Sequence, residues 1–367
     1  MAHAARHLPE PTCQPTSMTS PQRHALIDAL KAVVSQLIVL HHLAFYGPMA
    51  DYATPLAPEA MDWLFQYARI AVQTFLVMGG YLAAQSLARD GLLIHRPLGL
   101  IIFKRYAKLV PPYLAALIAA LIAAALARQF MSHPSIPDAP SAGQLITHLF
   151  LLHGIFGFDG LSAGVWYVGI DFQLYSLLAC TLWLTRKFGN QAITASRVLM
   201  LVLIAASLFV FNRDSGWDNW AIYFIGAYGL GAMAFWCVRP GHLSPWFIAA
   251  LAIGASGLAF DFRSRIAVAL VTAIALALTR FWPTLAAWPR LPLLGWLGNI
   301  SYSVFLIHFP VCLLINAVFE RFVPHTPGLQ LFGMLVAWAC SLAAGALFHQ
   351  KIELPAQRWL SAQRSLA

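Results

Sequence analysis

Two ionisable side chains, Lys31 and His42, stand on one long apolar segment of this sequence, Asp28–Tyr46. Ionisable groups at membrane depth are costly, and they are therefore candidates for function. His42 follows Lys31 by eleven residues. At about 100° per residue, the side chain of His42 points within roughly 20° of the direction of Lys31 and lies about 16 Å further along the helix axis. The spacing predicts a polar cavity that leads from a cation at the membrane edge to a histidine near the midplane.

Two interpretations of this pair stay open. In the first, Lys31 binds an anion and His42 is a catalytic base. In the second, Lys31 snorkels to the membrane surface and His42 is a hydrogen-bonded core histidine. Asp28 precedes Lys31 by three residues and can pair with it at the membrane edge. His41 points about 100° away from His42, so it is the weaker candidate for chemistry.

A basic segment and two proline residues mark the third apolar stretch. Lys104, Arg105 and Lys108 precede Pro111-Pro112. Cations suit phosphate oxygens, so this segment fits a mouth for a phosphate-bearing cytoplasmic substrate. Ordinary positively charged flanking of a membrane helix is the alternative.

Asp171 and Tyr175 lie four residues apart within an apolar segment and therefore share a helix face. A lone carboxylate there must be paired or protonated. We expect it to orient or polarise a histidine. The alternative is a structural hydrogen bond to a Tyr or an Arg, and Arg69 is a candidate partner. His308 is predicted to lie about as deep as His42, so the two histidines are expected to approach each other in one cavity.

The composition is that of an all-α, polytopic membrane protein. The chain has 367 residues, of which 60% are hydrophobic and 10% charged, with a mean hydropathy of +0.69. The formal net charge of +9 does not indicate nucleic-acid binding, because the basic residues occupy short loops without interleaved aromatic residues. The five cysteines show no metal-ligand spacing, so we predict buried structural thiols and no metal.

Hydropathy predicts a bundle of about ten transmembrane helices in one domain, residues 24–355. The helices are expected at about 27–46, 64–87, 101–127, 166–186, 197–212, 220–238, 245–260, 265–281, 297–316 and 329–350. The shorter apolar piece Gln144–Phe156 is predicted to be interfacial or re-entrant. Most of the 23 Lys and Arg residues fall on the N-terminal side of these helices, which places both termini in the cytoplasm. Residues 1–23 are expected to form a disordered cytoplasmic tail and residues 356–367 a second cytoplasmic tail.

Taken together, these segments resemble the acyltransferase type 3 membrane family, which includes bacterial O-antigen and exopolysaccharide O-acetyltransferases. The segments that carry the resemblance are Asp28–Lys31 with His42, Phe75–Leu82, Lys104–Pro111, Trp166–Tyr175, Ser301–Pro310 and Glu353–Pro355. Lys31 replaces the usual Arg, which keeps the charge but loses the planar fork. Asp171 replaces the usual Glu, Gln73 the usual Asp and Gly79 the usual Ser.

The resemblance implies transfer of an acyl group, most often acetyl, from cytoplasmic acyl-CoA to a hydroxyl of a glycan or lipid-linked sugar. Acyl-CoA would be a substrate rather than a permanently bound cofactor, and the protein would lie in a bacterial-type inner membrane. Lys31, Lys104, Arg105 and Lys108 would bind the donor. The catalytic residues would be His42 as base or transient acyl carrier, Asp171 and Tyr175 as orienting groups, and His308 as a lining residue.

Two other classes stay open on the sequence alone. A glycan or lipid transporter or flippase also needs buried charges and a central cavity. A non-catalytic assembly subunit would tolerate substitution of Lys31, His42 and Asp171 together. The acceptor, the length of the acyl chain and the oligomeric state are not decided by the sequence.

Overall fold

The computed structural model describes residues 24–89, 91–93, 95–289 and 291–364, so the tail predicted at residues 1–23 lies outside the described residues. Each of the ten predicted segments overlaps a helix, and most ends differ by no more than six residues, but the helix predicted from residue 64 begins at Val72. These helices are α1 (Ala25–Phe45), α4 (Val72–Leu87), α5 (Leu98–Ala127), α7 (Val165–Thr185), α8 (Ala192–Phe209), α9 (Ala221–Cys237), α10 (Pro245–Phe260), α11 (Ser264–Phe281), α12 (Pro292–Phe322) and α13 (Pro327–Phe348).

Short elements connect these helices. Between α1 and α4 lie α2 (Pro48–Ala53), η1 (Thr54–Leu56), α3 (Pro58–Gln66) and η2 (Ala68–Ala71), and α6 (Ala142–Leu149) lies between α5 and α7. Further along come η3 (Arg186–Gln191), η4 (Phe211–Arg213), η5 (Ser215–Trp217), the two-stranded hairpin of β1 (Val238–Arg239) and β2 (His242–Leu243), and η6 (Pro283–Ala287). The π-helical turn η7 (His349–Glu353) leads into α14 (Leu354–Arg364), which covers most of the predicted C-terminal tail.

Seven helical stretches of the described residues are long and apolar enough to cross a membrane. They are 25–45, 58–87, 98–127, 165–213, 264–281, 292–322 and 327–362, and α9 and α10 are shorter apolar helices. Because a membrane-spanning backbone must satisfy its own hydrogen bonds, such helices are the expected form of a spanning chain. The chain is thus an all-α membrane protein, while the number of crossings and the side of the termini stay predictions.

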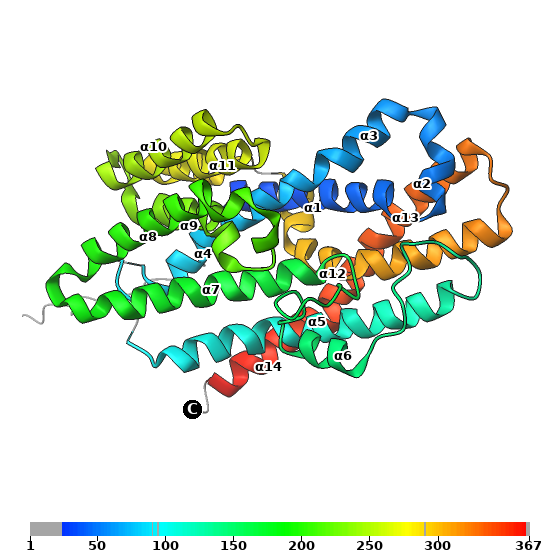
Figure 1. Ribbon diagram of the computed structural model, residues 1–367, viewed down its shortest axis with the longest axis horizontal. Coiled ribbons are helices and arrows are strands. Elements are labelled where there is room, and N and C mark those ends of the chain that lie inside the picture. Colours follow the sequence, from blue (N-terminus) through cyan, green and yellow to red (C-terminus); the bar gives the residue numbers. More distant parts are fainter. Residues whose placement is uncertain (1–23, 90, 94, 290, 365–367) are drawn as a thin grey trace, which may run out of the picture.

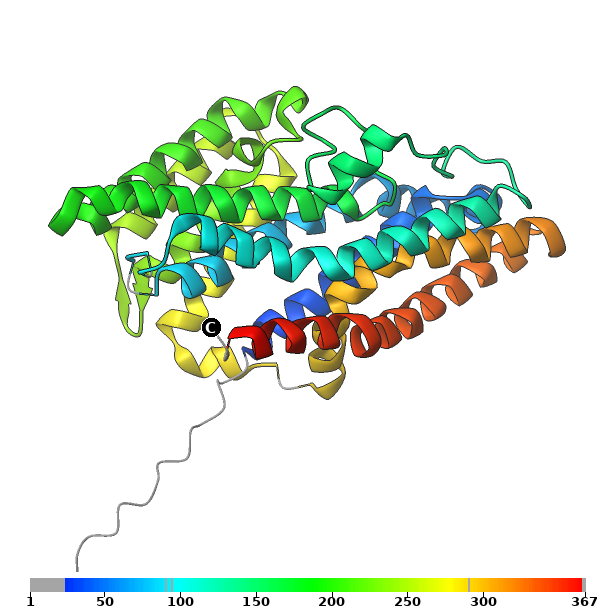
Figure 2. The same ribbon diagram turned by 90° about the horizontal axis from the view of Figure 1, so that it is seen from below.

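The helices form two groups that meet along the middle of the molecule. Figure 1 shows α8, α9, α10 and α11 gathered at one end and α2 and α3 with the far end of α12 at the other. Within the first group α9 packs on α4, α8 and α11, and within the second α12 packs on α1, α13 and α5. Figure 2 shows the loop segment around α6 on one side of the bundle and η6 with α14 on the opposite side.

Adjacent glycines let α4 and α9 touch backbone to backbone. A Cβ on Gly80 would come within 1.8 Å of the Tyr228 carbonyl oxygen, and one on Gly231 would come within 1.9 Å of the Val77 carbonyl oxygen. Small residues that permit close approach are a common basis of helix association in membranes. Gly80 and Gly231 therefore bring the backbones of α4 and α9 into direct contact.

The substitution Gly80→Ala is expected to destabilise the protein by about 1–3 kcal/mol, because the obstructing atom is backbone and cannot rotate away. Thermal unfolding of the detergent-solubilised protein measures this. Gly99 is also helical, but a Cβ there meets nothing within 4 Å, so Gly99→Ala is the matched control and should leave the unfolding temperature unchanged. Equal unfolding temperatures for the two variants would contradict the close contact.

Two buried histidines hold the segment that follows α6 against the start of α7. The rings of His148 and His153 stack with their centroids 4.1 Å apart. His148 Nδ1 donates to the Gln144 carbonyl at 2.7 Å, and its Nε2 accepts from the Leu161 amide at 3.2 Å. Burial lowers the pKa of His148, and burial beside His148 lowers the pKa of His153 to about 4. Both imidazoles are therefore neutral at pH 7.

Acid is expected to loosen this segment. The pKa values in the folded chain lie below the ordinary 6.5, so the stabilisation is complete above pH 6.5 and is lost progressively as the pH falls toward 4. Hydrogen exchange of residues 142–164, corrected for the intrinsic pH dependence, should rise between pH 7.5 and pH 5. His153→Phe keeps an aromatic ring without a titrating nitrogen and should reduce the rise. Replacement of the exposed His325 by Gln is the control and should leave the rise in hydrogen exchange unchanged.

Candidate functional site

The centre of the candidate site is a hydrogen bond between two buried histidines. His42 on α1 and His308 on α12 are 8% and 0% exposed, and His42 Nδ1 lies 2.7 Å from His308 Nε2. Their rings are nearly parallel, with centroids 4.9 Å apart. The approach predicted from their equal depth is confirmed, and the His42 ring faces protein rather than lipid.

The hydrogen bonds of His308 fix which nitrogen of each ring carries a proton. His308 Nδ1 lies 3.1 Å from the Val304 carbonyl oxygen, which can only accept, so Nδ1 is the donor. In the neutral pair His308 Nε2 is then the acceptor and His42 Nδ1 the donor. Neutral His42 consequently carries its lone pair on Nε2, the atom that a general base would use.

The neighbours of His42 on α1 differ in what they contact. His41 turns away and its Nδ1 donates to the Leu64 carbonyl at 2.9 Å, which ties α1 to α3. The Tyr46 ring lies 5.4 Å from the His42 ring, on the side where α1 ends. His41 therefore has a structural bond, whereas His42 bonds to another histidine.

A second polar group joins α5 to α7. Arg105 forms an ion pair with the buried carboxylate of Asp171, and its guanidinium lies 4.8 Å from the ring centroid of Tyr175. Asp171 and Tyr175 thus share a face, as their spacing predicted. The candidate partner Arg69 was wrong: Arg69 is exposed on η2, at the start of the α4 stretch, and Asp171 bonds to Arg105. The structure places Asp171 beside a guanidinium and not beside a histidine.

Sequence reasoning did not select Tyr228 and Tyr302, which lie at this ion pair, or the buried Tyr113, which lies near Tyr302. The hydroxyls of Tyr113, Tyr228 and Tyr302 and the Nε of Arg105 have no hydrogen-bond partner among the described residues. Unsatisfied buried polar atoms are rare in proteins and call for an explanation such as a bound ligand or water. Tyr113 and Tyr302 stand within segments already singled out, Pro111-Pro112-Tyr113 and Ser301–Pro310, whereas Tyr228 gave no sequence signal.

Aromatic rings connect the two polar groups. The Phe305 ring lies 6.3 Å from the His308 ring and 5.4 Å from the Tyr167 ring, and Tyr167 interacts with Asp171. Phe305 follows the second serine of Ser301-Tyr302-Ser303 by two residues, so this segment of α12 contributes to both groups. The histidine pair and the ion pair are therefore neighbours within one core, separated by aromatic side chains.

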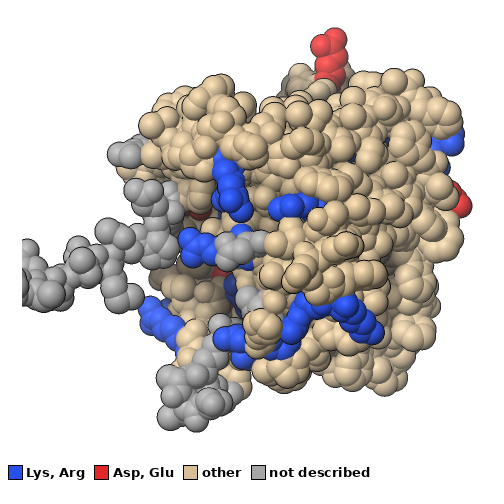
Figure 3. All heavy atoms as spheres, turned by 90° about the vertical axis from the view of Figure 1, so that its left-hand side faces the viewer, with Lys and Arg blue, Asp and Glu red and all other residues tan. Residues whose placement is uncertain are grey.

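The remaining predicted donor-binding residues lie toward the end of the bundle where α1 and α5 begin. Lys31 is half-buried on α1, Lys104 is half-buried on α5, and Lys108 is exposed one turn beyond Lys104. Because α5 begins at Leu98, Arg105 and Lys108 share a helix face. Figure 3 shows Lys and Arg side chains spread over the end of the molecule where the loops after α4, α7 and α9 lie. That these residues bind the donor stays a prediction.

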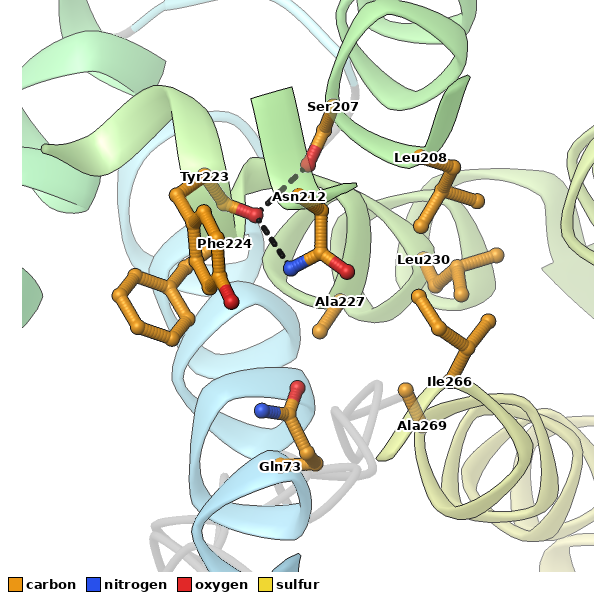
Figure 4. A pocket seen from close by; sticks show the side chains of 10 residues that line it. All are labelled: Gln73, Ser207, Leu208, Asn212, Tyr223, Phe224, Ala227, Leu230, Ile266 and Ala269. Carbon is orange, nitrogen blue, oxygen red and sulfur yellow. Dashed lines mark hydrogen bonds between the residues drawn. The ribbon is translucent and has the colours of Figure 1, made fainter. Parts of the chain in front are cut away.

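Gln73, which stands where the family usually has Asp, lies apart from both polar groups. It lines a small cavity of about 10 Å³ between α4, α8, α9 and α11, where Ser207 and Asn212 bond to the Tyr223 carbonyl (Figure 4). This volume is about that of one water molecule. The cavity therefore cannot hold a substrate.

A comparison with protein families shows the family to which this chain belongs. The model of a family described as acyltransferase domain, Acyl_transf_3, matches residues 24–347. The chain belongs to the acyltransferase type 3 family. Comparison with curated proteins and with solved structures found no match. The matched range contains His42, Arg105, Asp171 and His308, so the family domain includes both polar groups.

The substitution Asp171→Ala is expected to destabilise this acyltransferase by about 3 kcal/mol, because it leaves a partly buried guanidinium without its counter-ion. Asp171→Asn keeps an oxygen acceptor and should cost less. The double variant Arg105→Met/Asp171→Leu should unfold at a higher temperature than Asp171→Ala, since no unpaired charge remains. A double variant no more stable than Asp171→Ala in detergent would contradict the pairing.

Proposed function

We propose that the protein is an O-acyltransferase that moves an acyl group, most often acetyl, from cytoplasmic acyl-CoA to a hydroxyl of a glycan or lipid-linked sugar. The observation that carries this proposal is the hydrogen bond from His42 to His308 inside a family acyltransferase domain. A buried imidazole with a fixed tautomer is suited to proton transfer or to nucleophilic attack.

The chemistry can follow either of two routes through His42 Nε2. As a base, Nε2 takes the proton of the acceptor hydroxyl while the hydroxyl oxygen attacks the thioester carbonyl. The carbon–sulfur bond then breaks, and the leaving thiolate receives the proton from the imidazolium. As an acyl carrier, Nε2 attacks the carbonyl first and releases the thiolate. The hydroxyl oxygen then attacks the acyl-imidazolium, the carbon–nitrogen bond breaks to restore neutral His42, and the hydroxyl proton passes to the thiolate. In both routes His308 positions the His42 ring.

The ion pair and its tyrosines support the binding of a polar part of a substrate. The Nε of Arg105 and the hydroxyls of Tyr228 and Tyr302 offer donors beside Asp171, and the Tyr113 hydroxyl lies near Tyr302. A carbonyl or hydroxyl oxygen of donor or acceptor would satisfy these groups. Lys31, Lys104 and Lys108 are proposed to attract the phosphates of the donor on the cytoplasmic side, because cations bind phosphate oxygens.

The first test follows labelled acetyl-CoA with reconstituted protein and membranes that contain lipid-linked glycans. The wild type should release the free thiol of CoA and transfer the label to the glycan fraction. His42→Ala should lower both rates by at least about 100-fold, because general acid–base catalysis contributes that much. Replacement of the exposed His325 by Ala is the control and should change nothing. Movement of the acceptor without consumption of the thioester would instead identify a transporter.

The second test separates positioning from packing at His308. In His308→Ala, His42 Nδ1 loses its acceptor, so kcat is expected to fall about tenfold or more while KM stays close to that of the wild type. In His308→Gln the amide oxygen can accept the same hydrogen, and part of kcat should return. Equal kcat values for the two variants, with both folded, would remove His308 from the mechanism.

A further inference from the structure

A cavity of about 640 Å³ opens where the starts of α1 and α12 meet the end of α11 and the turn η6. Figure 2 shows η6 and the start of α12 near the beginning of α1. Its volume falls within the range of ~300–1,000 Å³ that small-molecule sites occupy. The lining residues come from the starts of α1 and α12, the end of α11, the β1–β2 hairpin and the segment that contains η6. They include the side chains of His24, Asp28, Thr279 and Arg280 and a wall of Pro and Ala residues.

Arg280 is held at the wall of this cavity. Its Nε donates to the Val238 carbonyl at 2.8 Å, and its guanidinium lies 4.2 Å from the ring centroid of Phe235. These contacts fix the cation, so it loses little further freedom when a ligand binds. A guanidinium fixed in this way is well suited to a phosphate group.

The helix starts add to the positive potential at the cavity. α1 begins at Ala25 and α12 at Pro292, and both residues line it. Exposed amide groups at helix starts attract anions. His24 precedes α1, and its buried Nδ1 has no hydrogen-bond partner among the described residues. Burial and the nearby charge of Arg280 lower the pKa of His24, so Arg280 is the cation near pH 7.

The other lining groups fit the remainder of a nucleotide. Asp28 offers a carboxylate that can accept from a hydroxyl or an amino group. Pro240, Pro283 and Pro289 offer apolar surface for a flat ring. One fixed cation, two helix starts, one carboxylate and apolar walls together match a phosphate-bearing nucleotide better than an inorganic anion.

The cavity also lies at the base of the helix face that leads to His42. His24 directly precedes α1 and Asp28 lies in its first turn, and Lys31 follows one turn beyond Asp28 on the same face. From Asp28 to His42 the helix rises about 21 Å. Lys31, one of the proposed donor-binding residues, therefore lies on α1 between this cavity and the histidine pair.

We propose that this cavity binds the nucleotide end of the thioester donor, with Arg280 as its principal phosphate contact. The inference rests on the proposed function and specifies where in the protein the nucleotide of the acyl-CoA donor binds. It adds Arg280, His24 and Asp28 to the donor site, none of which belongs to the basic segment Lys104–Lys108.

Blocking the cavity tests the assignment without removing Arg280. Gly295 lines it, and a Cβ there meets nothing within 4 Å, so Gly295→Trp should fold and fill the space. Gly328 is also near the start of a helix with nothing within 4 Å, but it lies outside the cavity, so Gly328→Trp is the matched control. The full-length protein in neutral phosphatidylcholine nanodiscs is titrated with CoA by calorimetry. Gly295→Trp should weaken CoA binding at least tenfold, and Gly328→Trp should bind as the wild type does.

Ligand fragments and a charge variant identify what is bound. Adenosine 3′,5′-bisphosphate, which represents the nucleotide end, should compete with acetyl-CoA, and pantetheine should not. Arg280→Gln should weaken CoA binding about tenfold, the loss of one charge-assisted hydrogen bond. Arg186→Gln removes a charge from η3, outside the cavity, and should leave the affinity for CoA unchanged. If anionic phospholipid binds to the wild type but not to Gly295→Trp while CoA binds equally to both, the site takes a lipid headgroup and the proposal is wrong.

The outcomes also distinguish this inference from the proposed function. If the wild type consumes acetyl-CoA and the Gly295→Trp and Arg280→Gln proteins do so with unchanged KM, the cavity assignment fails and the function stands. If the folded wild type neither binds CoA nor releases its thiol with any acceptor, the proposed function fails and the cavity assignment fails with it.

Discussion

Polar groups inside an apolar helix bundle must find partners within the protein, and the organisation of this chain follows from that constraint. Burying an unpaired charge or hydrogen-bonding group costs several kcal/mol in such surroundings. His42 meets the requirement by bonding to His308, and Asp171 meets it by pairing with Arg105. Each partner comes from a different helix, so the same bonds that satisfy the polar groups also fix α1 on α12 and α5 on α7.

The constraint is met unequally, and some of the exceptions among the described residues lie around the proposed site. Among the described residues, the hydroxyls of Tyr228 and Tyr302 have no hydrogen-bond partner, although they lie beside the paired Asp171 and Arg105. In a purely structural core, a buried hydroxyl without a hydrogen bond would destabilise the fold, and phenylalanine would be more stable at the same position. Their position near Asp171 supports a site whose polar groups are completed by substrate.

Close packing supplies the rigidity that these bonds need. The glycine contacts between α4 and α9 bring Gly79 within reach of Asp171 and Tyr228, because a Cβ on Gly79 would lie 3.6 Å from the carboxylate and 3.1 Å from the ring. On the other side of the bundle a Cβ on Gly298 would lie 2.4 Å from the Asp28 carbonyl oxygen, which brings the starts of α1 and α12 together. The same close approach shapes one wall of the cavity that Arg280 lines.

The sequence by itself determined the helical membrane class, the positions of the main helices and the family, because apolar periodicity and local motifs are properties of short segments. It also placed His42 and His308 at equal depth and Asp171 and Tyr175 on one face, since helix geometry is regular. Only the tertiary structure decided that Asp171 pairs with Arg105 and not Arg69, that Tyr228 joins the group, and that Arg280 meets His24 across a cavity. These contacts depend on how helices distant in sequence rotate and pack against one another, and helix periodicity carries no information about that.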